Sequence, residues 1–112
     1  NVYSACMVDQ ISVHDLKKKM DAGEKFVLVD VRNPNELDIC KFDNAVHIPL
    51  HLLTVRYNEI DRDAEIIMTC HHGGRSMQAA NFLIQQGYRN VSNLVGGIDA
   101  WASHIDPNMA QY

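Results

Sequence analysis

The chain has 112 residues, of which 46% are hydrophobic and 21% are charged. A chain of this length and composition can bury roughly two-thirds of its unfolded surface in one core, so we expect a single domain over residues 1–112 and exclude disorder, collagen and coiled coil. Ten Lys and Arg against fourteen Asp and Glu give a formal net charge of −4, which argues against nucleic acid as the main partner because such binding needs a basic patch.

The sequence also lacks the signals of a membrane protein or a disulfide-stapled one. No window approaches the roughly 18 consecutive apolar residues that a membrane span requires, and we expect no membrane partner. The cysteines are odd in number and too sparse for a disulfide framework: Cys6, Cys40 and Cys70. A reducing compartment, the cytoplasm, is therefore the expected location. Because the sequence opens without Met, it is compatible with a segment or fused domain upstream.

Short apolar runs alternate with amphipathic stretches along the chain, which is typical of an α/β fold with a parallel sheet. Ser12 and Asp15 form a capping-box pattern, apolar residues recur at helical spacing over residues 13–21, and Gly23 can end the helix. The unbroken apolar run over residues 26–29, which ends in Asp30, predicts a strand that is covered on both faces.

The middle of the chain predicts two helices around a short strand. Asn33 as cap, Pro34 at the first helical position and Glu36 in the first turn predict a short helix that ends near Cys40. The following elements are a strand over residues 45–48 and a helix over residues 52–60.

The last part of the chain carries the best-defined helix. A strand over residues 65–69 leads straight into the segment 70–76, and an apolar stripe then predicts a helix that begins near Ser76 and stops at Gly87. The final predicted elements are a strand over residues 91–95, a tight turn at Gly96-Gly97 and a helix from Ile98 to about His104.

Cys70 has the one setting in this sequence that indicates a specific chemical use. It lies between the carboxyl end of an apolar strand and the start of a helix, which is where open α/β sheets bind ligands. Gly73 and Gly74 let successive backbone N–H groups turn toward the sulfur, and the helix start adds the positive end of its dipole. Arg75 adds a positive charge that can hold an oxyanion by two hydrogen bonds. These features favour the thiolate, so we predict that Cys70 is a nucleophile rather than a packing cysteine.

The other two cysteines have no comparable setting. For Cys6 and Cys40 we expect packing or simple exposure, with a resolving-thiol role as the alternative.

The segment Cys-His-His-Gly-Gly-Arg-Ser over residues 70–76 closely resembles the active-site loop of rhodanese-like sulfurtransferases. Three further segments, over residues 29–36, 44–50 and 96–101, resemble other segments of that family in the same order. The resemblance spans residues 11–101. One departure is that Cys40-Lys41 and Asn44 stand where the family usually has Gly-His and Gly. Asn tolerates a left-handed turn almost as well as Gly, so we expect the turn to be kept.

This resemblance implies a five-stranded parallel sheet with helices on both faces, and a ping-pong sulfur transfer through a persulfide on Cys70. A sulfane sulfur would pass from thiosulfate or a related small donor to a thiol or to cyanide. A thioredoxin-like dithiol, glutathione and a sulfur-carrier protein all remain possible acceptors. The residues expected to hold the substrate and the persulfide are His71, His72, Gly73, Gly74, Arg75 and Ser76. Asp30 and Arg32 would support the site by anchoring neighbouring loops. No metal or organic cofactor is implied.

Three alternatives can be weighed from the residues. A cysteine phosphatase needs five residues between its Cys and Arg, whereas four separate Cys70 from Arg75, so the loop is one residue too tight for phosphate. A metal site at His71 and His72 is disfavoured, because a strand-to-helix loop should aim neighbouring side chains apart. A non-catalytic docking or regulatory module is the main rival, but such modules typically lack the cysteine.

Overall fold

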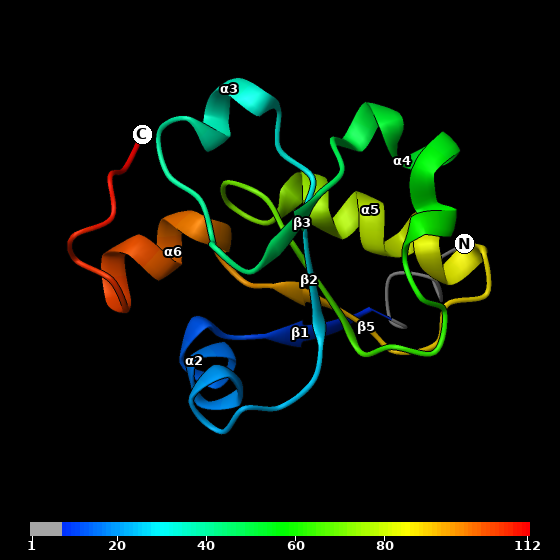
Figure 1. Cartoon of the computed structure of the whole chain (residues 1–112), viewed down its shortest axis with the longest axis horizontal. Coiled ribbons are helices and arrows are strands. Elements are labelled where there is room, and N and C mark those ends of the chain that lie inside the picture. Colours follow the sequence, from blue (N-terminus) through cyan, green and yellow to red (C-terminus); the bar gives the residue numbers. More distant parts are fainter. Residues whose placement is uncertain (1–7) are drawn as a thin grey trace.

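The computed structural model describes residues 8–112, and Figure 1 shows the chain as a sheet flanked by helices. Five strands, all parallel, form the sheet in the spatial order β1-β5-β4-β2-β3. Their bounds are β1 (Asp9–Ile11), β2 (Val27–Asp30), β3 (Ala45–His47), β4 (Ile66–Thr69) and β5 (Val91–Leu94). The expected fold class, a five-stranded parallel sheet with helices, is therefore confirmed.

Helices cover both faces of this sheet, as the family resemblance implied. One face packs against α2 (Val13–Asp21) and α6 (Gly97–His104), and the other against α4 (Leu50–Arg56) and α5 (Gly74–Gln85). A short α3 (Pro34–Leu37) and a 3₁₀ turn, η1 (Tyr57–Glu59), complete the structure. None of the helices among residues 8–112 is long and apolar enough to cross a membrane.

Alternation along the central strands produces the two layers of the core. Leu28 and Ile67 pack into the layer under α2 and α6, whereas Val29, Ile66 and Met68 pack into the layer under α4 and α5. Successive side chains of a strand point to opposite faces, so a strand buried on both faces must be apolar at nearly every position. This is why the continuous apolar runs of β2 and β4 marked them as central strands.

Local signals set the helix ends. Ser12 Oγ accepts a hydrogen bond from the Asp15 N–H at 3.1 Å, and Gly23 lies just past the helix end with a φ of +69°, as predicted for α2. Helix α5 begins at Gly74, so the prediction of a start near Ser76 was wrong by two residues. Of the two glycines in this loop, Gly73 has the left-handed φ of +115°, whereas Gly74 is the first residue of the helix.

Strand β1 was missed as an individual element. It has three residues, pairs with β5 alone, and is mostly exposed. A polar edge strand of this length carries no apolar run and no clear alternation, so only its hydrogen bonds to β5 define it.

Candidate active site

Cys70 immediately follows β4, the central strand of the sheet, and precedes the left-handed turn at Gly73 and the first residue of α5. The residue is 1% exposed, so its sulfur lies among the backbone groups of its own loop rather than in bulk water. The strand-to-helix setting that indicated a reactive cysteine is thus the one that the structure shows.

Three hydrogen-bond donors face the sulfur of Cys70. The Gly73 N–H lies 3.0 Å from Sγ, the Ser76 N–H lies 3.4 Å from it, and the Ser76 hydroxyl lies 3.3 Å from it. The Gly73 N–H can point inward because the φ of +115° at Gly73 turns the backbone there, and Ser76 contributes from the first turn of α5. Donors arranged in this way stabilise a negative charge on sulfur.

Behind these donors lies Asn93, a buried residue of β5 that the sequence analysis missed. Its Oδ1 lies 2.5 Å from Ser76 Oγ, and its Nδ2 donates to the Gly73 carbonyl at 3.2 Å and to Gln10 Oε1 at 3.4 Å. Asn93 thereby holds the backbone of the turn whose N–H faces Cys70. The available signal was an amide side chain in a strand expected to be buried, since buried polar side chains need partners.

Arg75 forms a bidentate ion pair with Glu36 at the start of α3. Nη1 lies 2.6 Å from Oε1, and Nη2 lies 2.8 Å from Oε2. The hydrogen bonds from Arg75 lower the pKa of Glu36 to about 2. Because both terminal nitrogens of Arg75 are on Glu36, its charge at the rim of the site is compensated. Binding of a substrate anion by Arg75 stays a prediction.

Asp30 and Arg32 form a second ion pair, buried at the carboxyl end of β2. Arg32 Nε and Nη2 donate to the Asp30 carboxylate at distances from 2.7 to 3.0 Å. Its guanidinium also donates to the carbonyl oxygens of Glu36 at 3.2 Å and of Cys40 at 3.0 Å. The pair therefore fixes the backbone of α3 at Glu36 and the chain just after it at Cys40.

Cys40 lies at intermediate exposure, and burial raises the pKa of its thiol. Its backbone carbonyl accepts a hydrogen bond from Arg32 Nη2 at 3.0 Å. The packing role expected for Cys40 agrees with its contact with the cluster under α2 and α6. Cys6 lies outside the described residues.

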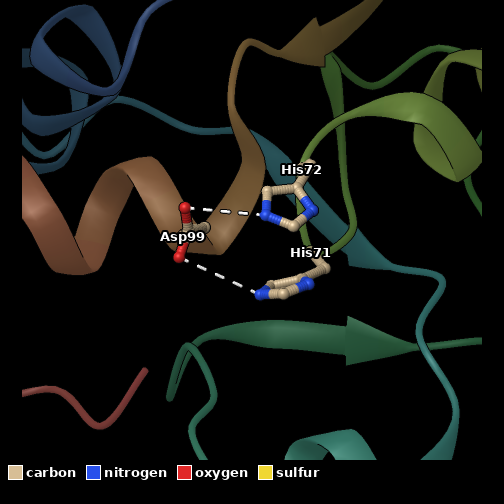
Figure 2. Close-up of side chains that lie close together, drawn as sticks. All are labelled: His71, His72 and Asp99. Atoms are coloured by element: carbon tan, nitrogen blue, oxygen red, sulfur yellow. Dashed lines mark ion pairs between the residues drawn. The ribbon is translucent and has the colours of Figure 1, made fainter. Parts of the chain in front are cut away.

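The two histidines of the loop do not point apart, and that expectation was wrong. The rings of His71 and His72 lie 3.8 Å apart between centroids, and both face Asp99 of α6 (Figure 2). The physical reason is that α6 approaches the loop so closely that a side chain at Gly97 would collide with the carbonyl oxygens of Cys70 and His71. This approach brings Asp99 close to both rings. Asp99 was not singled out from the sequence.

Tyr112 is a further residue that the sequence analysis did not place at the site. Its ring stacks on His71 at 3.8 Å with the planes 5° apart. Its hydroxyl donates to Glu36 Oε2 at 2.7 Å and accepts from Arg32 Nη1 at 3.1 Å. Burial is the main reason why the pKa of Tyr112 rises to about 12. One side chain thus contacts the Cys70 loop and both ion pairs.

A cavity of ≈ 430 Å³ opens beside Arg75, between α4 and α5. Leu50, Leu53 and Phe82 make much of its wall apolar, and Asn33 and Arg75 stand where it meets the rim of the site. A molecule in this cavity would therefore contact Arg75.

The sequence and the fold were compared with those of known proteins. The family described as "Rhodanese-like domain" matches residues 12–104. A protein of Allochromatium vinosum named "Sulfurtransferase" is 40% identical over 104 residues, which cover 93% of this chain and 97% of that protein. The "Putative sulfur carrier protein YrkF" of Bacillus subtilis is 36% identical and is matched over 92% of this chain and 56% of its own length. The crystal structure of a rhodanese-related protein from Thermoplasma volcanium superposes with a TM-score of 0.79 at 32% identity, covering 87% of this chain and 93% of that one.

Proposed function

We propose, from the premise that this chain belongs to the rhodanese-like domain family, that it is a sulfurtransferase which carries a sulfane sulfur as a persulfide on Cys70. The observation that carries the proposal is the set of three donors on Cys70 Sγ, at 3.0, 3.3 and 3.4 Å. The name of the 40% identical relative, "Sulfurtransferase", supports the same reaction class.

The reaction consists of two displacements at sulfur. The Cys70 thiolate attacks the outer sulfur of thiosulfate, the sulfur–sulfur bond of the donor breaks, and sulfite leaves with the bonding electron pair. The product is a Cys70 persulfide. An acceptor thiolate then attacks the outer sulfur, and Cys70 leaves as a thiolate, ready for the next donor. Cyanide in the place of the thiol gives thiocyanate. No oxidant or reductant is consumed, because the sulfane sulfur is only exchanged between partners.

The loop N–H groups act when charge resides on the sulfur. The Gly73 and Ser76 N–H groups stabilise the thiolate before attack and the leaving thiolate after transfer. They need no rearrangement during the reaction, since the turn at Gly73 and the start of α5 fix their directions. Asn93 contributes indirectly by holding the Gly73 carbonyl.

The Ser76 hydroxyl has one proton and two acceptors within reach. Oγ lies 3.3 Å from Cys70 Sγ and 2.5 Å from Asn93 Oδ1, and the proton can serve only one of them at a time. In our proposal it serves Sγ while the sulfur is a thiolate, and Asn93 while the sulfur is a thiol or persulfide. Ser76 thus adjusts its donation to the charge that each step places on Cys70.

The arrangement gives less support to the other candidate reactions. The Cys70 loop keeps four residues before Arg75, and the Arg75 fork binds Glu36 instead of facing the loop. Both features disfavour phosphate. A docking module would have no use for a buried cysteine with three hydrogen-bond donors on its sulfur, since such donors matter chiefly for an anionic sulfur.

For the partners, we propose thiosulfate or a related anionic donor and a thiol acceptor. The B. subtilis relative is named a putative sulfur carrier protein, which favours a sulfur-carrier protein among the possible acceptors.

The proposed function is tested by sulfur transfer from thiosulfate to cyanide, measured as thiocyanate formed. We expect activity in the wild-type protein and in Cys40→Ser, and none in Cys70→Ser. Asn93→Ala should retain Cys70 but lower kcat, because the Gly73 N–H and the Ser76 hydroxyl lose their support. Hydrolysis of an aryl phosphate should be no faster in the wild type than in Cys70→Ser. A Cys70-dependent phosphatase rate without thiocyanate formation would overturn the proposal.

A further inference from the structure

Two imidazole nitrogens and one carboxylate converge beside the Cys70 loop (Figure 2). His71 Nε2 lies 3.9 Å from Asp99 Oδ1, and His72 Nε2 lies 3.7 Å from Asp99 Oδ2. These distances are too long for hydrogen bonds, so neither ring binds the carboxylate directly. The three ligand atoms nevertheless lie within 4.8 Å of one another.

His71 Nε2 is the part of this group that needs a partner. The atom is buried, and within residues 8–112 no hydrogen-bond partner reaches it. A buried polar nitrogen without a partner is destabilising, so native structures usually supply one. The one carboxylate oxygen near it stands 3.9 Å away, which leaves room for an ion between the two atoms.

The backbone holds this group in place. The Ile98 N–H donates to the Cys70 carbonyl at 2.9 Å, and the Asp99 N–H donates to the His71 carbonyl at 3.0 Å. Gly97 permits this approach because a larger residue would collide with both carbonyls. The start of α6 is therefore fixed against the loop, and Asp99 does not depend on a flexible segment for its position.

Tyr112 orients the His71 ring on its other side. The stacked rings lie 3.8 Å apart between centroids, and the Tyr112 hydroxyl is held by Glu36 and Arg32. An oriented imidazole loses little freedom when it binds an ion, which is how neighbouring contacts commonly support metal ligands.

We propose that His71, His72 and Asp99 form a binding site for a divalent transition-metal ion of the Zn²⁺ class. Zinc binds imidazole nitrogen and carboxylate oxygen at about 2.0–2.2 Å, so neighbouring ligand atoms in a tetrahedral site stand about 3.4 Å apart. The ligand atoms, which lie within 4.8 Å of one another, must therefore close by up to about 1.4 Å, and the exposed His72 side chain can make most of this movement. Two nitrogens and one oxygen suit Zn²⁺, Co²⁺ or Cu²⁺ better than Mg²⁺ or Ca²⁺, which prefer oxygen ligands alone.

Three protein ligands leave one position of a tetrahedral ion open for water or a small anion. An ion bound here would join the His71-His72 part of the loop to α6. The inference does not depend on sulfur transfer, because it uses side chains that the proposed reaction leaves free.

The test is a titration with Co²⁺ followed by its replacement with Zn²⁺ in competition with a chromophoric chelator. We expect the visible bands of a four-coordinate Co²⁺ with nitrogen and oxygen ligands, without the charge-transfer band of a thiolate ligand. Cys70→Ser should bind with unchanged affinity, which separates this site from binding to the cysteine. His72→Ala, at an exposed position, and Asp99→Asn should each weaken Zn²⁺ binding at least tenfold.

The matched control is the chain's other histidine pair. The His14 and His104 rings lie 6.0 Å apart between centroids on an exposed surface, and His14→Gln with His104→Gln should leave the affinity unchanged. Equal affinity in wild type, His72→Ala and Asp99→Asn would overturn the proposal. Loss of binding in Cys70→Ser would overturn it in favour of a thiolate site.

Discussion

Two arginines near the carboxyl edge of the sheet each pair with a carboxylate, and the pairs differ in burial and in the number of their partners. The side chains of Arg32 and Asp30 are 0% and 2% exposed, and those of Arg75 and Glu36 are 35% and 12% exposed. Arg32 also binds two backbone carbonyls and the Tyr112 hydroxyl. Within residues 8–112, the Arg75 side chain donates hydrogen bonds to Glu36 alone.

The difference shows that an ion pair between arginine and a carboxylate can either hold the backbone in place or lie at the rim of a site. Arg32 uses its fixed fork of donors to hold the backbone around α3, and its charge cannot meet a substrate. Arg75 is within reach of solvent at the rim of the Cys70 loop, and only Glu36 compensates its charge. The first pair should govern stability, and the second should govern how the site meets anions.

The largest expected effect is on the stability of Arg32→Met. This change leaves Asp30 buried without its partner, and we expect the free energy of unfolding to fall by about 3–5 kcal/mol. Urea denaturation measures it. The matched control is Arg56→Met, whose pair with Glu59 is exposed, and it should change stability far less than Arg32→Met does. Similar losses in the two variants would show that burial does not distinguish these pairs.

The next effect is the dependence of stability on acid pH. Glu36 has a pKa of about 2 in the folded protein against an ordinary value of 4.5, so the unfolded chain binds a proton first. The stabilisation is complete above pH 4.5 and is lost as the pH falls toward 2, with a total of about 2 kcal/mol after screening at Arg75. Glu36→Gln should remove this component from unfolding free energies measured across that range. An unchanged slope in Glu36→Gln would assign the acid sensitivity to other groups.

A smaller pair of effects concerns the KM for the sulfur donor, thiosulfate. Arg75→Met leaves the Glu36 charge uncompensated and should raise the KM for thiosulfate by about fivefold, corresponding to about 1 kcal/mol at a solvent-exposed site. Glu36→Gln frees the Arg75 charge and should lower that KM. An uncharged organic trisulfide is the control donor, and its KM should hardly change in either variant. If the KM for thiosulfate changed in the same direction in both variants, the charge balance between Arg75 and Glu36 would not control anion binding.

Tyr112→Phe should have the smallest effect. It removes one hydroxyl from between the two pairs and leaves the ring on His71, so we expect a loss of about 1 kcal/mol in unfolding free energy. Combining it with Glu36→Gln in a double-mutant cycle should give a loss smaller than the sum. Strict additivity would mean that the hydroxyl does not act through Glu36.

Sequence reasoning was most successful where the signal is local. The apolar runs of β2 and β4, the caps of α2 and the strand-to-helix position of Cys70 all follow from neighbours within a few residues. The partners that complete the site come from far along the chain. Tyr112 meets Arg32 across 80 residues, and Asn93 meets Gly73 across 20. Such contacts depend on the tertiary arrangement and leave no periodic pattern.

The two histidines show the same limit. Their convergence on Asp99 depends on how closely α6 approaches the loop. Gly97 permits this approach, but a glycine in the sequence does not by itself predict it. Likewise, the sequence placed the positive charge of Arg75 beside Cys70. That Glu36 compensates this charge could be seen only once the position of α3 was known. Residue type and order therefore predicted the strand-to-helix position of Cys70, and the network around it had to come from the structure.

The most direct test of the account is the intact mass of the protein before and after treatment with thiosulfate. We expect the wild type and the Cys6→Ser and Cys40→Ser variants to gain the mass of one sulfur atom, and cyanide to remove it. Cys70→Ser should gain nothing, because among the described cysteines only Cys70 has donors placed around its sulfur. Equal labelling of Cys70→Ser, or no gain in the wild type, would contradict the assignment of Cys70 as the carrier of sulfur.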